Sequence, residues 1–107
     1  MCSTQTGTPY YTSPEIWKGH KYGRKCDIWS TGCLLYEMCT LHPPFRAKDF
    51  PGLYRKVIVG NYDPIPSSYS SDLSDLIRMC LTVDEDMRPE ARDLLETTIL
   101  SGMELSL

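Results

Sequence analysis

A carboxylate and a guanidinium that lie far apart in the sequence, Glu15 and Arg88, are candidates for a structural ion pair. Arg88 precedes Pro89, which biases its backbone toward an extended conformation between two helices. Arginine suits a buried carboxylate because its guanidinium forms two parallel hydrogen bonds. Deleting one partner of such a buried pair costs about 3–5 kcal/mol. From the residues alone, two solvated surface charges are the favoured alternative.

The other residues that could do chemistry do not form a metal-binding pattern. The five cysteines are Cys2, Cys26, Cys33, Cys39 and Cys80. They contain no C-x-x-C pair, and His20 and His42 do not flank them at metal-ligand spacing. Several lie among apolar residues, which favours buried free thiols in a reducing compartment. The acidic run 84–86 is interpreted as a solvated turn, with Mg²⁺ binding as a remote alternative. We expect no metal site.

Composition limits the chain to one domain and excludes some classes of partner. The chain has 107 residues, of which 41% are hydrophobic and 23% charged. Its net charge of −3 gives no electrostatic reason to expect nucleic acid or an anionic membrane as partner. The first six residues lack the pattern of a signal peptide, and no apolar run has membrane-spanning length. We expect a soluble, intracellular protein.

The positions of apolar residues, prolines and glycines predict an all-α fold. Helices are expected over residues 27–40, 49–59, 71–81 and 89–101, with a short helical turn after Ser13. Asp27 is expected to cap the first of the four long helices. That helix is apolar nearly all round, so it belongs in an interior, and we expect Trp29 to pack in the core.

The order of motifs resembles the C-terminal lobe of a protein kinase. Residues 7–15 read Gly-Thr-Pro-Tyr-Tyr-Thr-Ser-Pro-Glu, and the last three stand where a kinase activation segment closes with Ala-Pro-Glu. The motifs Asp27-Ile28-Trp29-Ser30-x-Gly32, Pro43-Pro44-Phe45 and Arg88-Pro89 follow in kinase order. Residues 53–58 and 64–66 are further similar to the NIMA-related (NEK) Ser/Thr kinases.

This resemblance implies a partial protein kinase domain over residues 1–107. Residues 1–25 would be the end of the activation segment and the loop after it, and residues 26–101 the helices of the large lobe. The small lobe and the catalytic loop would lie outside the chain. The family reaction is the ATP-dependent phosphorylation of protein serine or threonine, with ATP and Mg²⁺ as cofactors.

The resemblance also assigns roles to single residues near the N-terminus. It implies that Thr8 hydrogen-bonds the catalytic aspartate and lysine and helps to seat the substrate hydroxyl. Gly7, Pro9 and Thr12 match the loop that receives the substrate residue after the phosphorylated one. NEK-like kinases usually carry methionine at the position of Thr12, so this subsite departs from the pattern. Thr4 matches the activating phosphothreonine, with a plain solvated loop as the alternative.

Three further roles follow from the same resemblance. In the family, the residues matching Glu15 and Arg88 form a buried ion pair between the activation segment and the last helices. With the family in view, we predict this pair here. In the family, the aspartate matching Asp27 also holds the catalytic loop in place. That loop is not in these 107 residues, so only the capping role of Asp27 can be exercised here. Asp27 and Trp29 are expected to anchor the central helix.

The chain contains none of the motifs with which a kinase handles ATP. No glycine begins a G-x-G-x-x-G loop, neither histidine begins an H-x-D motif, and residues 27–29 are not D-F-G. We therefore expect a substrate-side fragment that is inactive alone and needs no cofactor by itself. The alternative is a non-catalytic module that binds a protein substrate or a partner kinase. An exposed apolar patch would favour self-association. The resemblance suggests a cytoplasmic location with cytoskeletal association.

Overall fold

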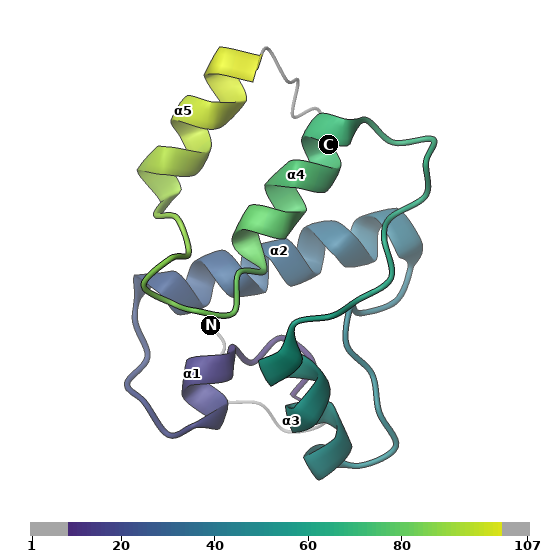
Figure 1. The fold of residues 1–107 in the computed structure, drawn as a ribbon, viewed down its shortest axis with the longest axis vertical. Helices are drawn as coiled ribbons and strands as arrows, with labels where there is room; N and C mark the ends of the chain where they lie inside the picture. The colour runs from purple at the N-terminus through teal and green to yellow at the C-terminus, as the bar shows by residue number, and fades with distance from the viewer. Residues whose placement is uncertain (1–8, 102–107) are drawn as a thin grey trace.

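The computed structural model describes residues 9–101, and these residues form helices without a strand (Figure 1). The helices are α1 (Pro14–Trp17), α2 (Arg24–Thr40), α3 (Phe50–Val59), α4 (Ser71–Cys80) and α5 (Ala91–Ser101). The predicted all-α class is therefore confirmed. Helix α2 runs through the middle of the molecule, with α4 packed on one side and the contacting pair α1 and α3 on the other.

Helix α2 begins earlier than the sequence pattern predicted. Its first residue is Arg24 and its N-cap is Gly23, so the prediction that Asp27 caps this helix is wrong. Asp27 instead lies within the first turn, where a negative charge suits the positive end of the helix dipole. The exposed carboxylate of Asp27 accepts a hydrogen bond from the hydroxyl of Tyr22.

Contacts with the segment before α5 explain the early start. The Nζ atom of Lys25 donates to the backbone carbonyls of Glu85, at 2.9 Å, and Arg88, at 2.5 Å. Arg24 forms an ion pair with Glu90 at 3.0 Å. Two cations are unfavourable at a helix N-terminus. Here each cation has a partner that is distant in the sequence, and a pattern of local residue types does not reveal such partners.

Helix α2 is buried on one side and partly exposed on the other. Leu41 ends the helix in the left-handed conformation, with φ 66°, and its N–H donates to the carbonyl of Glu37 at 2.7 Å. The exposed side includes Leu34 and Met38, which retain 46% and 48% of their accessible surface, and Leu41 retains 88%. An apolar strip along α2 is therefore open in the described part of the chain.

Helices α3 and α4 have the caps that their sequences favour. Asp49 accepts a hydrogen bond from the backbone N–H of Gly52 at 2.8 Å, and Ser70 accepts one from Leu73 at 3.1 Å. Gly60 ends α3 with φ 74°, a conformation that glycine adopts at no steric cost. The predicted positions of both helices are confirmed to within a residue at each end.

Helix α5 begins two residues after the predicted start at Pro89. Its first-turn residue Asp93 accepts a hydrogen bond from the backbone N–H of Glu90 at 3.1 Å. Leu95, on this helix, is 60% exposed. Within residues 9–101, none of the helices is long and apolar enough to cross a membrane.

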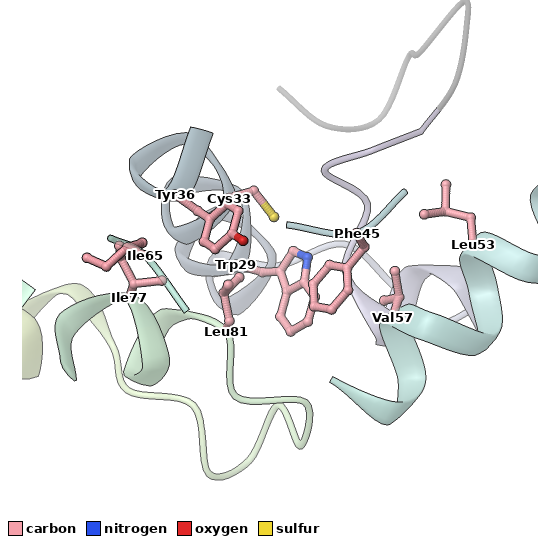
Figure 2. Packing of buried hydrophobic residues seen from close by; sticks show 9 residues of the cluster. All are labelled: Trp29, Cys33, Tyr36, Phe45, Leu53, Val57, Ile65, Ile77 and Leu81. Carbon is pink, nitrogen blue, oxygen red and sulfur yellow. The ribbon is translucent and has the colours of Figure 1, made fainter. Parts of the chain in front are cut away.

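Nine residues contributed by α2, α3, α4 and the segments beside them form the core (Figure 2). They are Trp29, Cys33, Tyr36, Phe45, Leu53, Val57, Ile65, Ile77 and Leu81. The ring of Trp29 stacks on that of Phe45, with 5.7 Å between centroids and 10° between planes. Trp29 is fully buried, in agreement with its predicted place in the core.

Close packing of α2 on α4 depends on Gly32. A Cβ atom at this position would lie 2.5 Å from the Cβ of Cys80, which is too close for any side chain.

The described cysteines are free thiols, and burial raises the pKa of Cys80 to about 11. Burial likewise raises the pKa of Cys33. Both thiols therefore stay protonated at neutral pH and pack as small apolar groups.

Candidate functional site

Glu15, from α1, and Arg88, from the loop before α5, meet in the interior. Arg88 Nη1 lies 2.7 Å from Glu15 Oε2, and Nη2 lies 2.9 Å from Oε1. Arg88 is 1% exposed and Glu15 3%. The two side chains therefore form a buried, bidentate ion pair between residues that are 73 positions apart in the sequence.

All five N–H groups of the Arg88 guanidinium have a partner. Besides the two bonds to Glu15, Arg88 donates to the backbone carbonyls of Lys25 (2.8 Å), Thr82 (2.8 Å) and Val83 (3.1 Å). Its Cζ also lies 5.1 Å from the centre of the Trp29 ring, within the range of a cation–π contact. Arg88 thus joins α1, α2 and the loop after α4 at one point.

Glu15 remains ionised at this point. Burial raises the pKa of the Glu15 carboxyl, but the hydrogen bonds and charge of Arg88 outweigh this effect. Together with a backbone hydrogen bond and the thiol of Cys26, they hold the pKa below its usual 4.5. The thiol of Cys26 donates to Glu15 Oε2 at 3.3 Å. The hydroxyl of Ser13 in turn donates to the sulfur of Cys26 at 3.3 Å. Glu15 is therefore bound both by Arg88, from the loop before α5, and by Cys26 of α2.

This lowered pKa predicts a dependence of stability on pH. A carboxyl whose pKa is lower in the folded state contributes stability above its unfolded pKa, and this stability is lost as the pH falls through the folded value. We expect the free energy of unfolding to fall on acidification below about 4.5, the ordinary value for this carboxyl. Glu15→Gln should remove this part of the dependence. Urea unfolding followed by circular dichroism across the acid range measures it.

The control for this experiment is Glu96→Gln, because Glu96 is exposed on α5. This variant should keep the wild-type dependence. If Glu15→Gln and the wild type lose stability in parallel on acidification, Glu15 does not have the lowered pKa.

The residues before Glu15 are bound to α2 by Tyr11. Its hydroxyl donates to the carboxylate of Glu37, and its carbonyl accepts from Ser30 Oγ at 3.3 Å. Burial and the hydrogen bond to Glu37 raise the pKa of Tyr11 to about 12. The phenol therefore stays protonated at neutral pH and continues to donate to Glu37. The backbone from Pro9 to α1 is consequently fixed against the central helix.

The structure places some predicted site residues and not others. Thr4, Gly7 and Thr8 lie outside the described residues. Pro9 is partly exposed, whereas Thr12 is buried at 8% exposure, so little of its surface is open to a ligand. No three histidine, cysteine or acidic side chains within residues 9–101 lie close enough to hold a metal ion.

Sequence reasoning missed the contacts that fix this segment in place. The pairing of Tyr11 with Glu37 joins residues 26 positions apart, and that of Ser13 with Cys26 joins residues 13 apart. Neither pair has a spacing that marks it as a contact. Tyrosine does carry a weak signal, because a buried tyrosine hydroxyl usually finds a polar partner.

A comparison with models of protein families assigns the chain to a family. The model of the protein kinase domain matches residues 2–100. The chain therefore belongs to the protein kinase domain family.

The similar proteins include several NIMA-related kinases. Over 98 residues the chain is 49% identical to the probable serine/threonine-protein kinase nek2 of Dictyostelium discoideum, covering 92% of this chain and 23% of that protein. It is 43% identical over 103 residues to the G2-specific protein kinase nimA of Emericella nidulans, covering 96% and 15%. For the serine/threonine-protein kinase Nek4 of Mus musculus, the identity is 44% over 95 residues, covering 89% and 12%. The chain thus spans less than a quarter of the length of these relatives.

Proposed function

We propose that this chain is the substrate-side part of a NEK-like Ser/Thr protein kinase. In the family reaction, the γ-phosphoryl group passes from ATP to a serine or threonine hydroxyl of a protein, and ADP is released. The observation that carries the proposal is the buried pair of Glu15 and Arg88. It holds the segment that resembles the end of an activation segment against the helices that would form the large lobe.

The residues around this segment would position the substrate. Thr8 would help to seat the substrate hydroxyl, while Gly7 and Pro9 would border the subsite for the next residue. Because Thr12 is buried, its part would be to hold the shape of this loop. Thr4 is proposed as a phosphorylation site, where added negative charge would order the loop if an arginine lay opposite.

We further propose that residues 1–107 alone do not transfer phosphate. Kinase catalysis relies on a glycine-rich loop, a strand lysine, a catalytic aspartate and an aspartate that holds Mg²⁺, and the 107 residues contain none of these motifs. ATP and Mg²⁺ would be bound by a catalytic part of the kinase, in the same chain or a partner. Such a part would also supply the aspartate that Thr8 contacts.

Calorimetry with Mg-ATP and residues 1–107 tests this part of the proposal. We expect no binding heat at nucleotide concentrations up to about 1 mM, the upper end of ordinary enzyme KM values. Micromolar affinity for Mg-ATP would contradict the proposal. In parallel, far-UV circular dichroism verifies that the protein is helical, so that the absence of heat cannot be due to unfolding.

The exposed apolar strip on α2, formed by Leu34, Met38 and Leu41, supports the second candidate, a non-catalytic module. We propose that a catalytic part of the kinase, a partner kinase or a second copy of the chain covers this strip, since exposed apolar surface favours association.

A cytoplasmic location with cytoskeletal association is proposed from the resemblance to NEK kinases.

A further inference from the structure

A hollow of about 570 Å³ lies beside the C-terminal half of α3, away from the pair of Glu15 and Arg88. This volume is within the range of small-ligand sites, about 300–1,000 Å³. Its lining includes three cationic side chains, those of Arg46, Arg55 and Lys56. The only carboxylate in the lining is that of Asp63, so the hollow has a local formal charge of +2, whereas the whole chain carries −3.

These three cations are available to a ligand. All three residues are exposed, and none has a carboxylate within ion-pair distance among residues 9–101. The Nζ atom of Lys56 donates to the backbone carbonyl of Arg46 at 2.5 Å. This bond holds the end of α3 close to the segment after α2, so charges from both elements border one space. Lys56 also suits the negative end of the α3 dipole, but the dipole does not account for Arg46.

Aromatic side chains from outside α3 form another part of the lining, and contacts with one another and with the backbone hold them in place. The ring of Tyr36 makes edge contacts with those of Tyr62, at 5.4 Å between centroids, and His42, at 5.7 Å. The hydroxyl of Tyr36 donates to the carbonyl of Asp63 at 2.7 Å. The hollow therefore combines a partly apolar wall, fixed by these contacts, with exposed cationic side chains, as expected of a site that recognises a ligand with both apolar and anionic groups.

We propose that this hollow, which we call the α3 pocket, binds an acidic peptide segment of a protein partner. Glutamate or aspartate side chains of the partner would pair with Arg46 and Arg55, because a guanidinium binds a carboxylate through two parallel hydrogen bonds. Apolar parts of the peptide would pack on the partly exposed rings of Tyr62 and His42, since Tyr36 is itself buried. Three cations with a carboxylate among them do not form the broad basic surface on which nucleic acid binding depends. Of these two classes of macromolecule, an acidic peptide is therefore the one that the α3 pocket fits.

This proposal goes beyond the proposed kinase function and does not depend on it. Acidic-segment binding uses α3 and the end of α2 and requires neither ATP nor a substrate hydroxyl. A chain that transfers no phosphate in any assembly would still bind such a peptide. Equally, a kinase whose α3 pocket binds nothing would still fit the family match.

Fluorescence anisotropy with residues 1–107 tests the α3 pocket. The probe is a labelled 12-residue peptide with six glutamates, and the reference is the same peptide with glutamine at those positions. We expect the acidic peptide to bind more tightly and its affinity to fall as salt screens the charges. The double variant Arg55→Glu, Lys56→Glu should bind it at least ~10-fold more weakly, because opposed like charges disfavour an interface strongly. Arg55→Gln should give a smaller loss of the same sign.

A matched control makes the same change of charge elsewhere. Lys18→Glu, Lys21→Glu reverses two exposed lysines that do not line the α3 pocket, and it should bind within about 2-fold of wild type, since distant surface charges are screened. Circular dichroism confirms that each variant is folded. The proposal is overturned if wild type does not bind the acidic peptide or binds the glutamine peptide equally well. It is also overturned if the control variant weakens binding as much as the double variant, or if duplex DNA binds more tightly than the peptide.

Discussion

Replacing Arg88 with alanine is expected to destabilise the fold by about 3–5 kcal/mol. The substitution leaves the carboxylate of Glu15 buried without a counter-ion, and it removes hydrogen bonds to three backbone carbonyls. Small domains are stable by about 5–15 kcal/mol in total, so most of the stability could be lost. Urea unfolding followed by far-UV circular dichroism measures the change.

Two further variants show whether the buried pair is the cause. Removing both charges with Glu15→Leu and Arg88→Met should cost much less than the sum of the single changes, because neither charge is left unpaired. Arg78→Ala removes an exposed arginine that pairs with Asp75 and should change stability by less than about 1 kcal/mol. Additive effects of the two buried substitutions would contradict the structural account.

Replacing Trp29 with alanine is expected to cost about 3–5 kcal/mol, the usual range for removing a large buried aromatic side chain. Trp29 is fully buried, stacks on Phe45 and lies beneath the guanidinium of Arg88. Its loss would leave a cavity between the core and the ion pair. Because the two sites are in contact, the effects of Trp29→Ala and Arg88→Ala should not be additive.

Leu34→Ala is the matched control for Trp29→Ala, since it truncates an apolar residue of the same helix. Leu34 is 46% exposed, so this change should stay within about 1 kcal/mol of wild type. Guanidinium titrations of both variants provide the comparison. If Trp29→Ala were no more destabilising than Leu34→Ala, α2 would not be the centre of the fold.

Local patterns were sufficient to predict most of the fold. The periodic apolar residues of α4, the proline near the start of α3 and the glycine after it specify helices whose ends are set by nearby residues. The start of α2 was predicted three residues late because Lys25 and Arg24 are stabilised by partners about 60 residues away. A local pattern of residue types cannot predict a helix end that depends on contacts distant in the sequence.

The candidate site was predictable only with the family resemblance. The residue types of Glu15 and Arg88 allow a buried pair, but taken alone they favour two surface charges. The order of motifs favoured the pair, and the structure places the two side chains in bidentate contact. The α3 pocket could not be anticipated, because its cations come from two segments that only the folded chain brings together.

A chimeric kinase tests the central claim most directly. Residues 2–100 would replace the matching segment of the Dictyostelium discoideum nek2 protein, which is 49% identical over 98 residues. We expect this chimera to phosphorylate a general Ser/Thr protein substrate within ~10-fold of the parent rate. Thr8→Val in the chimera should lower the rate ~100-fold or more, as loss of a transition-state hydrogen bond does, and Thr8→Ser should retain activity. A folded chimera with no more activity than its Thr8→Val variant would contradict the claim that this chain is the substrate-side part of a Ser/Thr kinase.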